Sequence, residues 1–261
     1  MNKLFVMAQP RSGSTLVQRL INCDSDFRIL GEHMGILRGI SQSWYAMEGG
    51  RFDPQFLNLG GGKRHFSNGS KVEAVNDWTA LRNGLTEESV LDTFRAVVEE
   101  VLKPASGCKT TGFKEIRYGL IGDHTIEMLA ALFPESKFLC VYRNPADMIR
   151  SHAGSGYFPG TIDDRCSAYN HQLLAFLRAS RQLGSRCWIV NYSQVTNGET
   201  GWVTFCGSVW TKKHSDVLQT RIGGTFGDYR LSEEELRIVR ASCETAYSAI
   251  EKTRKEQDDA H

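Results

Sequence analysis

The sequence has no long hydrophobic run and almost no net charge. A membrane-spanning helix needs about 18 consecutive apolar residues, whereas the run nearest the N-terminus covers only residues 4–8. This run is also too short for a signal peptide, so we expect no membrane span and a cytoplasmic location. Lys and Arg number 31 against 30 Asp and Glu. This balance argues against nucleic acid as a partner.

The sequence also lacks the closely spaced Cys or His pairs that are typical of metal sites and disulfides. The seven cysteines are scattered and form no C-x-x-C pair, and the seven histidines form no H-x-x-x-H pair. Zinc sites and disulfide frameworks normally show closer, paired spacing. We therefore expect reduced, mostly buried thiols and no bound metal.

The sequence does contain apolar segments that alternate with helical ones. Buried strands are expected at residues 4–8, 138–142 and 187–192. Helices are expected at residues 15–21, 86–103, 123–133 and 232–255. Strands without polar alternation, separated by helices, are typical of a parallel sheet covered on both faces. The predicted fold class is therefore α/β, with a central parallel sheet flanked by helices in one domain over residues 1–261.

Two segments stand apart from this pattern. Residues 49–75 contain three consecutive glycines and no helical period, so we expect a mobile surface insertion. The charged residues 253–261 are expected to form a frayed tail.

A turn of small and polar residues, Pro10-Arg11-Ser12-Gly13-Ser14-Thr15, joins the first strand to the first helix. A helix N-terminus exposes unpaired N–H groups and a partial positive charge, so anions bind there. Arg11 adds a fixed cation, while Ser12, Ser14 and Thr15 add hydroxyl donors. The alternative is an ordinary turn with a capping serine. The Gly-Lys-Ser/Thr of a nucleoside triphosphate loop is absent, which disfavours a kinase.

A second strand-to-helix junction carries another pair of polar residues. Arg143 leaves the end of the strand 138–142, and Ser151 follows it by eight residues, two turns along the next helix. This spacing allows both side chains to face one phosphate, with the helix start aimed at the same crevice. His152, the next residue, is expected on the helix surface.

Both segments resemble motifs of the sulfotransferase family. Residues 6–16 resemble its 5′-phosphosulfate loop, and residues 138–151 resemble its 3′-phosphate segment. The arginine in the loop is similar to bacterial-type and tyrosylprotein-type members. The resemblance implies a P-loop-like fold and the donor 3′-phosphoadenosine 5′-phosphosulfate (PAPS), with adenosine 3′,5′-bisphosphate (PAP) as product and no metal. It implies donor binding by Arg11, Ser12, Gly13, Ser14, Thr15, Arg143 and Ser151.

A third segment, residues 219–229, is similar to the glycine-rich loop that closes over the donor in this family. A lysine and a tryptophan of the family pattern are replaced here by Ile222 and Tyr229. The partial resemblance implies that Arg221, Gly223 and Gly224 contact the 3′-phosphate. The alternative is a plain glycine-rich loop before a helix.

Sulfuryl transfer requires a cation near the leaving oxygen and donors around the sulfuryl group. Lys114, in the segment Gly112-Phe113-Lys114-Glu115, is similar to the strand-end catalytic lysine of the family, and Arg11 would share its role. Arg117 is a further candidate for phosphate or substrate contact. The alternative for Lys114 is a surface lysine at a strand end.

The reaction also needs a base that takes the acceptor's proton. Glu32 is favoured, because residues 28–38 resemble the Gly-Glu segment of tyrosylprotein sulfotransferases. Its pKa would have to be raised by apolar surroundings. His33 has a better ordinary pKa for this task, and Glu115 is a third candidate. Neighbours on an extended segment point opposite ways, so we expect only one of Glu32 and His33 to face the acceptor.

The sequence therefore predicts an enzyme, a PAPS-dependent sulfotransferase acting on a hydroxyl or amine. The expected acceptor is a small molecule or a lipid-like alcohol, and no oligomeric state is predicted. Aromatic candidates for its pocket, each alternatively part of the core, are Trp44, Tyr45, Trp78 and Phe158. The alternative functions are a P-loop kinase-like phosphotransferase and a non-catalytic nucleotide-binding protein. The second would need neither Lys114 nor a base.

Overall fold

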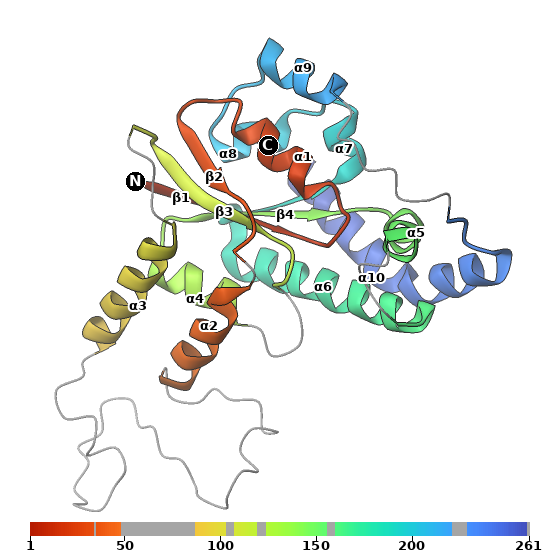
Figure 1. The fold of residues 1–261 in the computed structure, drawn as a ribbon, viewed down its shortest axis with the longest axis horizontal. Coiled ribbons are helices and arrows are strands. Elements are labelled where there is room, and N and C mark those ends of the chain that lie inside the picture. Colours follow the sequence, from red (N-terminus) through yellow and green to blue (C-terminus); the bar gives the residue numbers. More distant parts are fainter. Residues whose placement is uncertain are drawn as a thin grey trace, which may run out of the picture.

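The computed structural model describes residues 1–33, 35–47, 87–102, 107–118, 124–155, 160–220 and 229–259. In these ranges five strands form a parallel sheet in the order β2-β3-β1-β4-β5 (Figure 1). The strands are β1 Asn2–Ala8, β2 Phe27–Leu30, β3 Thr110–Glu115, β4 Lys137–Tyr142 and β5 Cys187–Asn191. The predicted α/β class with a central parallel sheet is confirmed.

Helices cover both faces of the sheet (Figure 1). One face carries α1 Ser14–Ile21, α7 Tyr192–Thr196, α8 Gly201–Cys206 and α9 Lys212–Gln219. The other carries α2 Ile36–Met47, α3 Glu87–Leu102, α4 Thr125–Leu132, α6 Ile162–Leu183 and α10 Glu233–Asp259. The remaining two are α5 Pro145–Ser155, which follows β4, and the short 3-10 helix η3 Gly184–Arg186. Among these described helices, none has the length and apolar character needed to cross a membrane.

The central strands bury side chains on both faces. Along β1, Leu4, Val6 and Ala8 belong to the core beside α1 and α8, whereas Phe5 and Met7 belong to the core on the opposite face. This division follows from the alternation of side chains along a strand. Because both faces of β1 are buried, residues 4–8 form one continuous apolar run.

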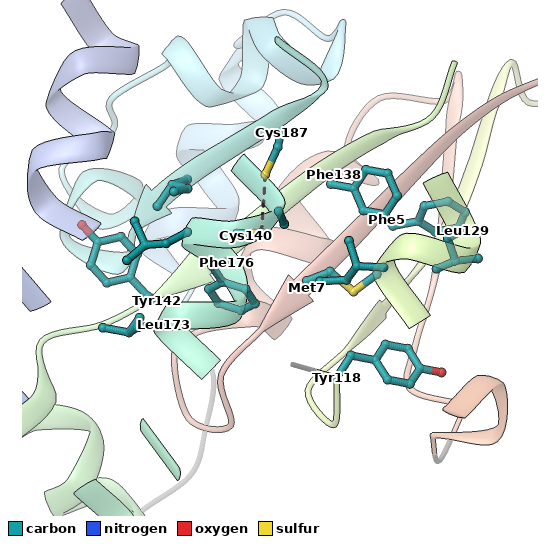
Figure 2. Packing of buried hydrophobic residues seen from close by; sticks show 14 of the residues in the cluster. Phe5, Met7, Tyr118, Leu129, Phe138, Cys140, Tyr142, Leu173, Phe176 and Cys187 are labelled. Carbon is teal, nitrogen blue, oxygen red and sulfur yellow. Dashed lines mark hydrogen bonds between the residues drawn. The ribbon is translucent and has the colours of Figure 1, made fainter. Parts of the chain in front are cut away.

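Helix α6 packs against the middle of the sheet (Figure 2). Its residues Leu173 and Phe176 share a buried cluster with Phe5 and Phe138. The ring centroid of Phe5 lies 5.0 Å from that of Phe113 and 5.4 Å from that of Phe138. Tilted aromatic pairs of this kind contribute about 0.5–1.5 kcal/mol beyond their buried area. These rings join β1, β3 and β4, and α6 packs on them through Leu173 and Phe176.

The C-terminal helix is longer than expected. The frayed tail predicted for residues 253–261 is instead helical as far as Asp259. Within it, Arg254 pairs with Glu251 at 3.0 Å, and Gln257 Nε2 donates to the first carbonyl of β5 at 2.8 Å. Ion pairs at this spacing support a helix, and the bond to the sheet ties down its last turns.

The strand order produces a reversal at the carboxyl end of β1. The chain passes from β1 to β2 on one side of the sheet, and from β4 to β5 on the other. In open α/β sheets such a reversal opens a crevice beyond the strand ends, where ligands bind. Residues 9–13 follow β1 and residues 143–151 begin directly after β4. Both predicted phosphate segments therefore lie at this crevice.

Candidate active site

The loop between β1 and α1 has an unusual backbone. Arg11 has a φ of 62° and Gly13 a φ of 87°, so both are in the left-handed region. Left-handed residues in a turn direct successive N–H groups to one side and form a concave anion site. For a residue other than glycine this conformation costs about 1–3 kcal/mol and is concentrated at functional sites. The strain at Arg11 is consistent with a binding loop.

Two buried polar atoms of this loop and of the segment after β4 form no hydrogen bond with the residues that the structure describes. Ser12 is fully buried, and its Oγ forms no hydrogen bond in the described part of the chain. The same holds for the buried Nε of Arg143. An unsatisfied buried polar group costs about 1–3 kcal/mol, and in native folds it often marks a ligand or bound water. The hydroxyl of Ser12 and the Nε–H of Arg143 are hydrogen-bond donors that suit an oxyanion.

The two predicted phosphate segments, one after β1 and one after β4, contact each other. Nε of Arg11 donates to Oγ of Ser151 at 3.1 Å. Next to this bond, the ring of His152 contacts the carbonyl oxygen of Pro10 through Nε2 at 2.9 Å. The folded chain thus places the loop after β1 against the helix after β4.

His152 was expected on the helix surface, and this expectation is wrong. His152 is only 3% exposed, because α5 packs the side that carries it against the loop that follows β1. Burial lowers the pKa of His152 below its ordinary value of 6.5, although the contact with the Pro10 carbonyl opposes the shift. His152 is therefore neutral at physiological pH and donates its Nε2 hydrogen to that carbonyl.

Tyr192, at the start of α7, lies against the loop, and sequence reasoning missed it. A Cβ atom on Gly13 would lie 2.1 Å from Cδ2 of Tyr192, so the ring packs directly on the Gly13 backbone. The guanidinium of Arg143 lies 4.8 Å from the centroid of the same ring, a cation–π contact. Its position as the last residue of the predicted strand 187–192 was the only signal in the sequence, since site residues in this fold class lie at strand ends.

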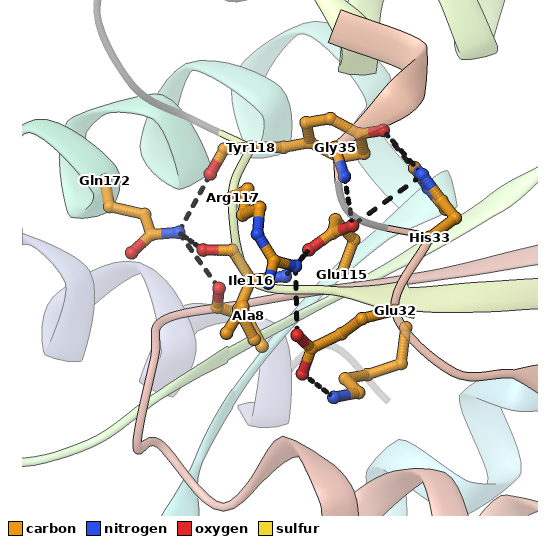
Figure 3. A network of polar contacts seen from close by, with 10 residues as sticks. Ala8, Glu32, His33, Gly35, Glu115, Ile116, Arg117, Tyr118 and Gln172 are labelled. Atoms are coloured by element: carbon orange, nitrogen blue, oxygen red, sulfur yellow. Dashed lines mark hydrogen bonds and ion pairs between the residues drawn. The ribbon is translucent and has the colours of Figure 1, made fainter. Parts of the chain in front are cut away.

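A second group of charges lies at the end of β3 (Figure 3). Lys114 is 4% exposed, and its ammonium forms an ion pair with Oε1 of Glu32. Oε2 of Glu32 accepts a hydrogen bond from Arg117 at 2.9 Å. The structure thus brings together three predicted site residues from two distant segments.

Glu115, the third candidate base, is fully buried and fully bonded. Its Oε2 accepts from the N–H of Gly35 at 2.9 Å, while Oε1 accepts from the N–H of Ile116 at 2.8 Å and from Arg117 at 2.6 Å. Burial raises the pKa of Glu115, but these donors outweigh burial and hold the pKa below its ordinary value. Glu115 is therefore ionised, with both oxygens occupied.

His33 and Glu32 point to different partners, as expected for neighbours on an extended segment (Figure 3). Nε2 of His33 lies 3.1 Å from the hydroxyl of Tyr118, and Nδ1 lies 3.7 Å from the Glu115 carboxylate. The His33 ring meets Phe113 edge-on at a centroid distance of 4.4 Å. Burial lowers the pKa of His33, although the charge of Glu115 opposes the shift. At neutral pH the ring is therefore uncharged.

Some predicted residues lie outside this geometry. Trp44 is buried and belongs to the core. The following lie outside the described residues: Arg221, Gly223, Gly224, Trp78, Phe158, the side chain of Tyr45 and the segment 49–75. In the ranges that are described, no group of three or more His, Cys, Asp or Glu side chains is arranged to hold a metal ion.

The strand order, together with the left-handed loop that joins β1 to α1, defines a P-loop-like α/β fold. A profile described as the sulfotransferase family matches residues 3–204, which include the segments after β1, β3 and β4. The chain belongs to the sulfotransferase family. No curated protein matches its sequence.

The chain is also similar to solved structures. The sulfotransferase domain from the curacin biosynthetic pathway is 15% identical, with a TM-score of 0.53 over 92% of this chain and 96% of that one. The sulfotransferase domain from the Synechococcus PCC 7002 olefin synthase is 17% identical, with a TM-score of 0.48 over 95% and 88%. Retinol dehydratase in complex with androsterone and the inactive cofactor PAP is 12% identical, with a TM-score of 0.46 over 94% and 80%. At these identities the first likeness shows the fold alone, so the activity has to be argued from the residues.

Proposed function

We propose that the chain is a PAPS-dependent sulfotransferase that acts on a hydroxyl or amine of a small-molecule or lipid-like acceptor in the cytoplasm. The observation that carries the proposal is the hydrogen bond from Arg11 to Ser151 at 3.1 Å. It joins the loop proposed for the 5′-phosphosulfate to the helix proposed for the 3′-phosphate, at a single crevice. PAPS supplies an activated sulfuryl group and leaves as PAP, and no metal is required.

The donor is proposed to bind across the two joined segments. The N–H groups of residues 12–15 and the Ser12 hydroxyl hold its 5′ end, and Arg143 and Ser151 hold its 3′-phosphate. The buried Ser12 Oγ and Arg143 Nε support this assignment, because neither has a partner in the described residues and both suit an anion. From the motif, Arg221, Gly223 and Gly224 are proposed to contact the same phosphate.

Lys114 is proposed to neutralise the charge that develops on the leaving oxygen. Lys114 pairs in register with Val6 of β1. Paired residues of neighbouring strands face the same side of a sheet. The Lys114 side chain therefore lies on the face covered by α1, whose N-terminus ends the phosphate loop. An ammonium carries three N–H groups, so the ion pair with Glu32 leaves others to contact PAPS. Arg11 shares this role.

Glu32 is proposed as the general base. The acceptor's proton has to leave close to the transferred group, and Glu32 is the candidate that contacts Lys114. When Lys114 turns to the leaving oxygen, a Glu32 oxygen becomes free to accept that proton. His33 is the alternative base. Glu115 is instead proposed to position its neighbours, because it is fully buried and each of its oxygens accepts from a backbone N–H that cannot turn away.

Calorimetry with PAP and with ATP tests the proposal, using Arg143→Ala and a matched control on the same helix. The control is Arg150→Ala, whose guanidinium is half exposed and pairs with Asp147 at 2.8 Å. Loss of a charge-assisted hydrogen bond costs about 1.5–3 kcal/mol, so Arg143→Ala should weaken PAP binding about 10- to 100-fold. Arg150→Ala should bind PAP within about twofold of the wild type.

The same calorimetry, together with a transfer assay, discriminates between the alternatives. Binding of ATP without PAP would favour a phosphotransferase. Binding of PAP with no transfer of labelled sulfate from PAPS to a panel of alcohols, phenols and amines would favour a non-catalytic nucleotide-binding protein. Equal PAP affinity in the wild type and Arg143→Ala would remove the proposed 3′-phosphate site.

A further inference from the structure

The side-chain amide of Gln172, on α6, lies beneath the point where β1 and β3 end (Figure 3). Its Nε2 lies 2.9 Å from the carbonyl oxygen of Ala8, 2.8 Å from that of Tyr118 and 3.4 Å from that of Ile116. Gln172 is only 3% exposed. An amide nitrogen carries two hydrogens, so Ala8 and Tyr118 accept the two short bonds and Ile116 makes a weaker third contact.

These carbonyls lie beyond the last pair of the ladder between β1 and β3. Met7 pairs with Glu115, and β3 ends at that residue. Beyond this pair the two strands separate, and separated strands leave their carbonyls without ladder donors. Gln172 supplies the missing donors from below. Its amide therefore bridges the two strand ends.

Each of the bonded carbonyls belongs to a segment of the proposed site. Ala8 directly precedes the phosphate loop. Ile116 and Tyr118 lie on either side of Arg117, in the segment that also contains Lys114. A single amide thus connects the loop proposed for the donor with the residues proposed for the leaving oxygen.

The same face of α6 also contacts the third segment of the crevice. Tyr169 lies one turn before Gln172, and its hydroxyl donates to the carbonyl of Arg143 at 2.9 Å. Gln9 Nε2 donates to the backbone carbonyl of Tyr169 at 3.2 Å. One turn of α6 therefore contacts the segments that follow β1, β3 and β4.

We infer that Gln172 is a positioning residue of the proposed sulfuryl-transfer site. Its amide holds the loop after β1 and the Lys114–Arg117 segment at the spacing that one donor molecule requires. Gln172 itself lies below both segments and acts only through the carbonyls it binds. This inference rests on the proposed function, because the spacing matters only when both segments contact one reactant.

The first test compares Gln172→Leu with Gln257→Leu. Gln257 Nε2 also donates from a helix to a strand carbonyl, at 2.8 Å, but this carbonyl belongs to Cys187 at the opposite end of the sheet. Both variants lose an amide donor to a strand, so both should lower the urea midpoint. Gln172→Leu should raise the Kd of PAP about tenfold, whereas Gln257→Leu should leave it within about twofold of the wild type.

The second test is Gln172→Glu, which makes positioning dependent on pH. A protonated carboxyl can donate one hydrogen bond to the carbonyls, whereas an ionised carboxylate would repel all three. Burial and these oxygens both raise the pKa of such a group. The ratio of the variant's PAP Kd to that of the wild type should therefore rise as pH increases through that pKa. Neither the wild type nor Gln172→Leu should show this transition.

Two results would overturn the inference. The first is an equal change in PAP affinity for Gln172→Leu and Gln257→Leu. The second is a pH-independent affinity ratio for Gln172→Glu, and this measurement also decides the matter if Gln172→Leu does not fold. Failure of the proposed function would look different, since the wild type itself would then either not bind PAP or bind it without transferring sulfate from PAPS.

Discussion

Replacing Gly13 by alanine tests how tightly the proposed phosphate loop, residues 10–15, is packed. The new Cβ would lie 2.1 Å from Cδ2 and 2.2 Å from Cε2 of Tyr192, whereas non-bonded carbons approach only to about 3.5–4.0 Å. Gly13 also has a φ of +87°, which costs alanine about 1–2 kcal/mol. Overpacking adds about 1–3 kcal/mol. Gly13→Ala should therefore lower the free energy of unfolding by about 2–5 kcal/mol.

Gly207→Ala is the matched control. Gly207 has a φ of +88°, and a Cβ added there would meet nothing within 4 Å. This variant should lose only the backbone contribution, about 1–2 kcal/mol. In urea unfolding, the difference between the two variants therefore measures the displacement of Tyr192. Gly13→Ala should also weaken PAP binding, because the displaced ring contacts Arg143, whereas Gly207→Ala should not.

A double variant completes the test. If the Tyr192 ring causes the extra loss, Tyr192→Ala should remove the overpacking part of the Gly13→Ala penalty, so the two substitutions should be non-additive. Equal losses of stability in Gly13→Ala and Gly207→Ala, together with a Gly13→Ala penalty that Tyr192→Ala leaves unchanged, would refute this packing.

Four further predictions concern the proposed chemistry and the pH dependence of folding. Ser151→Ala should weaken PAP binding at least about tenfold in calorimetry, since it removes a proposed phosphate ligand and the partner of Arg11. Glu32→Gln should lower kcat about 10²- to 10⁴-fold with PAP affinity unchanged; an active Glu32→Gln beside an inactive His33→Ala would make His33 the base. Transfer should continue in EDTA, because the cations of the site can neutralise the sulfuryl charge, and a strict requirement for Mg²⁺ would contradict this. Burial lowers the pKa of both His33 and His152 from 6.5, so the unfolded chain binds more protons below that pH. Urea midpoints should therefore be steady near neutrality and fall as the pH drops below about 6.5; a rise would contradict the assigned burial.

Three of the five described strands were predictable because their signal is local. The runs 4–8, 138–142 and 187–192 correspond to β1, β4 and β5 within about one or two residues at each end. These three strands are buried on both faces and mostly apolar, so composition alone reveals them. β2 was missed as a strand because it has only four residues, one of them the exposed Arg28.

Helix α6 was not predicted, and its sequence explains why. Its buried face includes Tyr169, Gln172 and Ser180, so the apolar period of an amphipathic helix is interrupted by polar side chains. Those polar residues bind carbonyls and side chains of the sheet and of α10. The feature that hides the helix in the sequence is the one that connects it to the strand ends.

By itself the sequence determined the apolar strands, the glycine and hydroxyl groups of the phosphate loop, and the charged residues that follow three strands. These depend on neighbours along the chain, so their spacing is already meaningful before folding. Only the tertiary structure decided that Arg11 meets Ser151, that Tyr192 packs on Gly13, and that Gln172 joins the ends of two strands. Such contacts join residues from separate strand–helix units, and which units become neighbours is set by how both faces of the sheet are buried, a property of the whole chain.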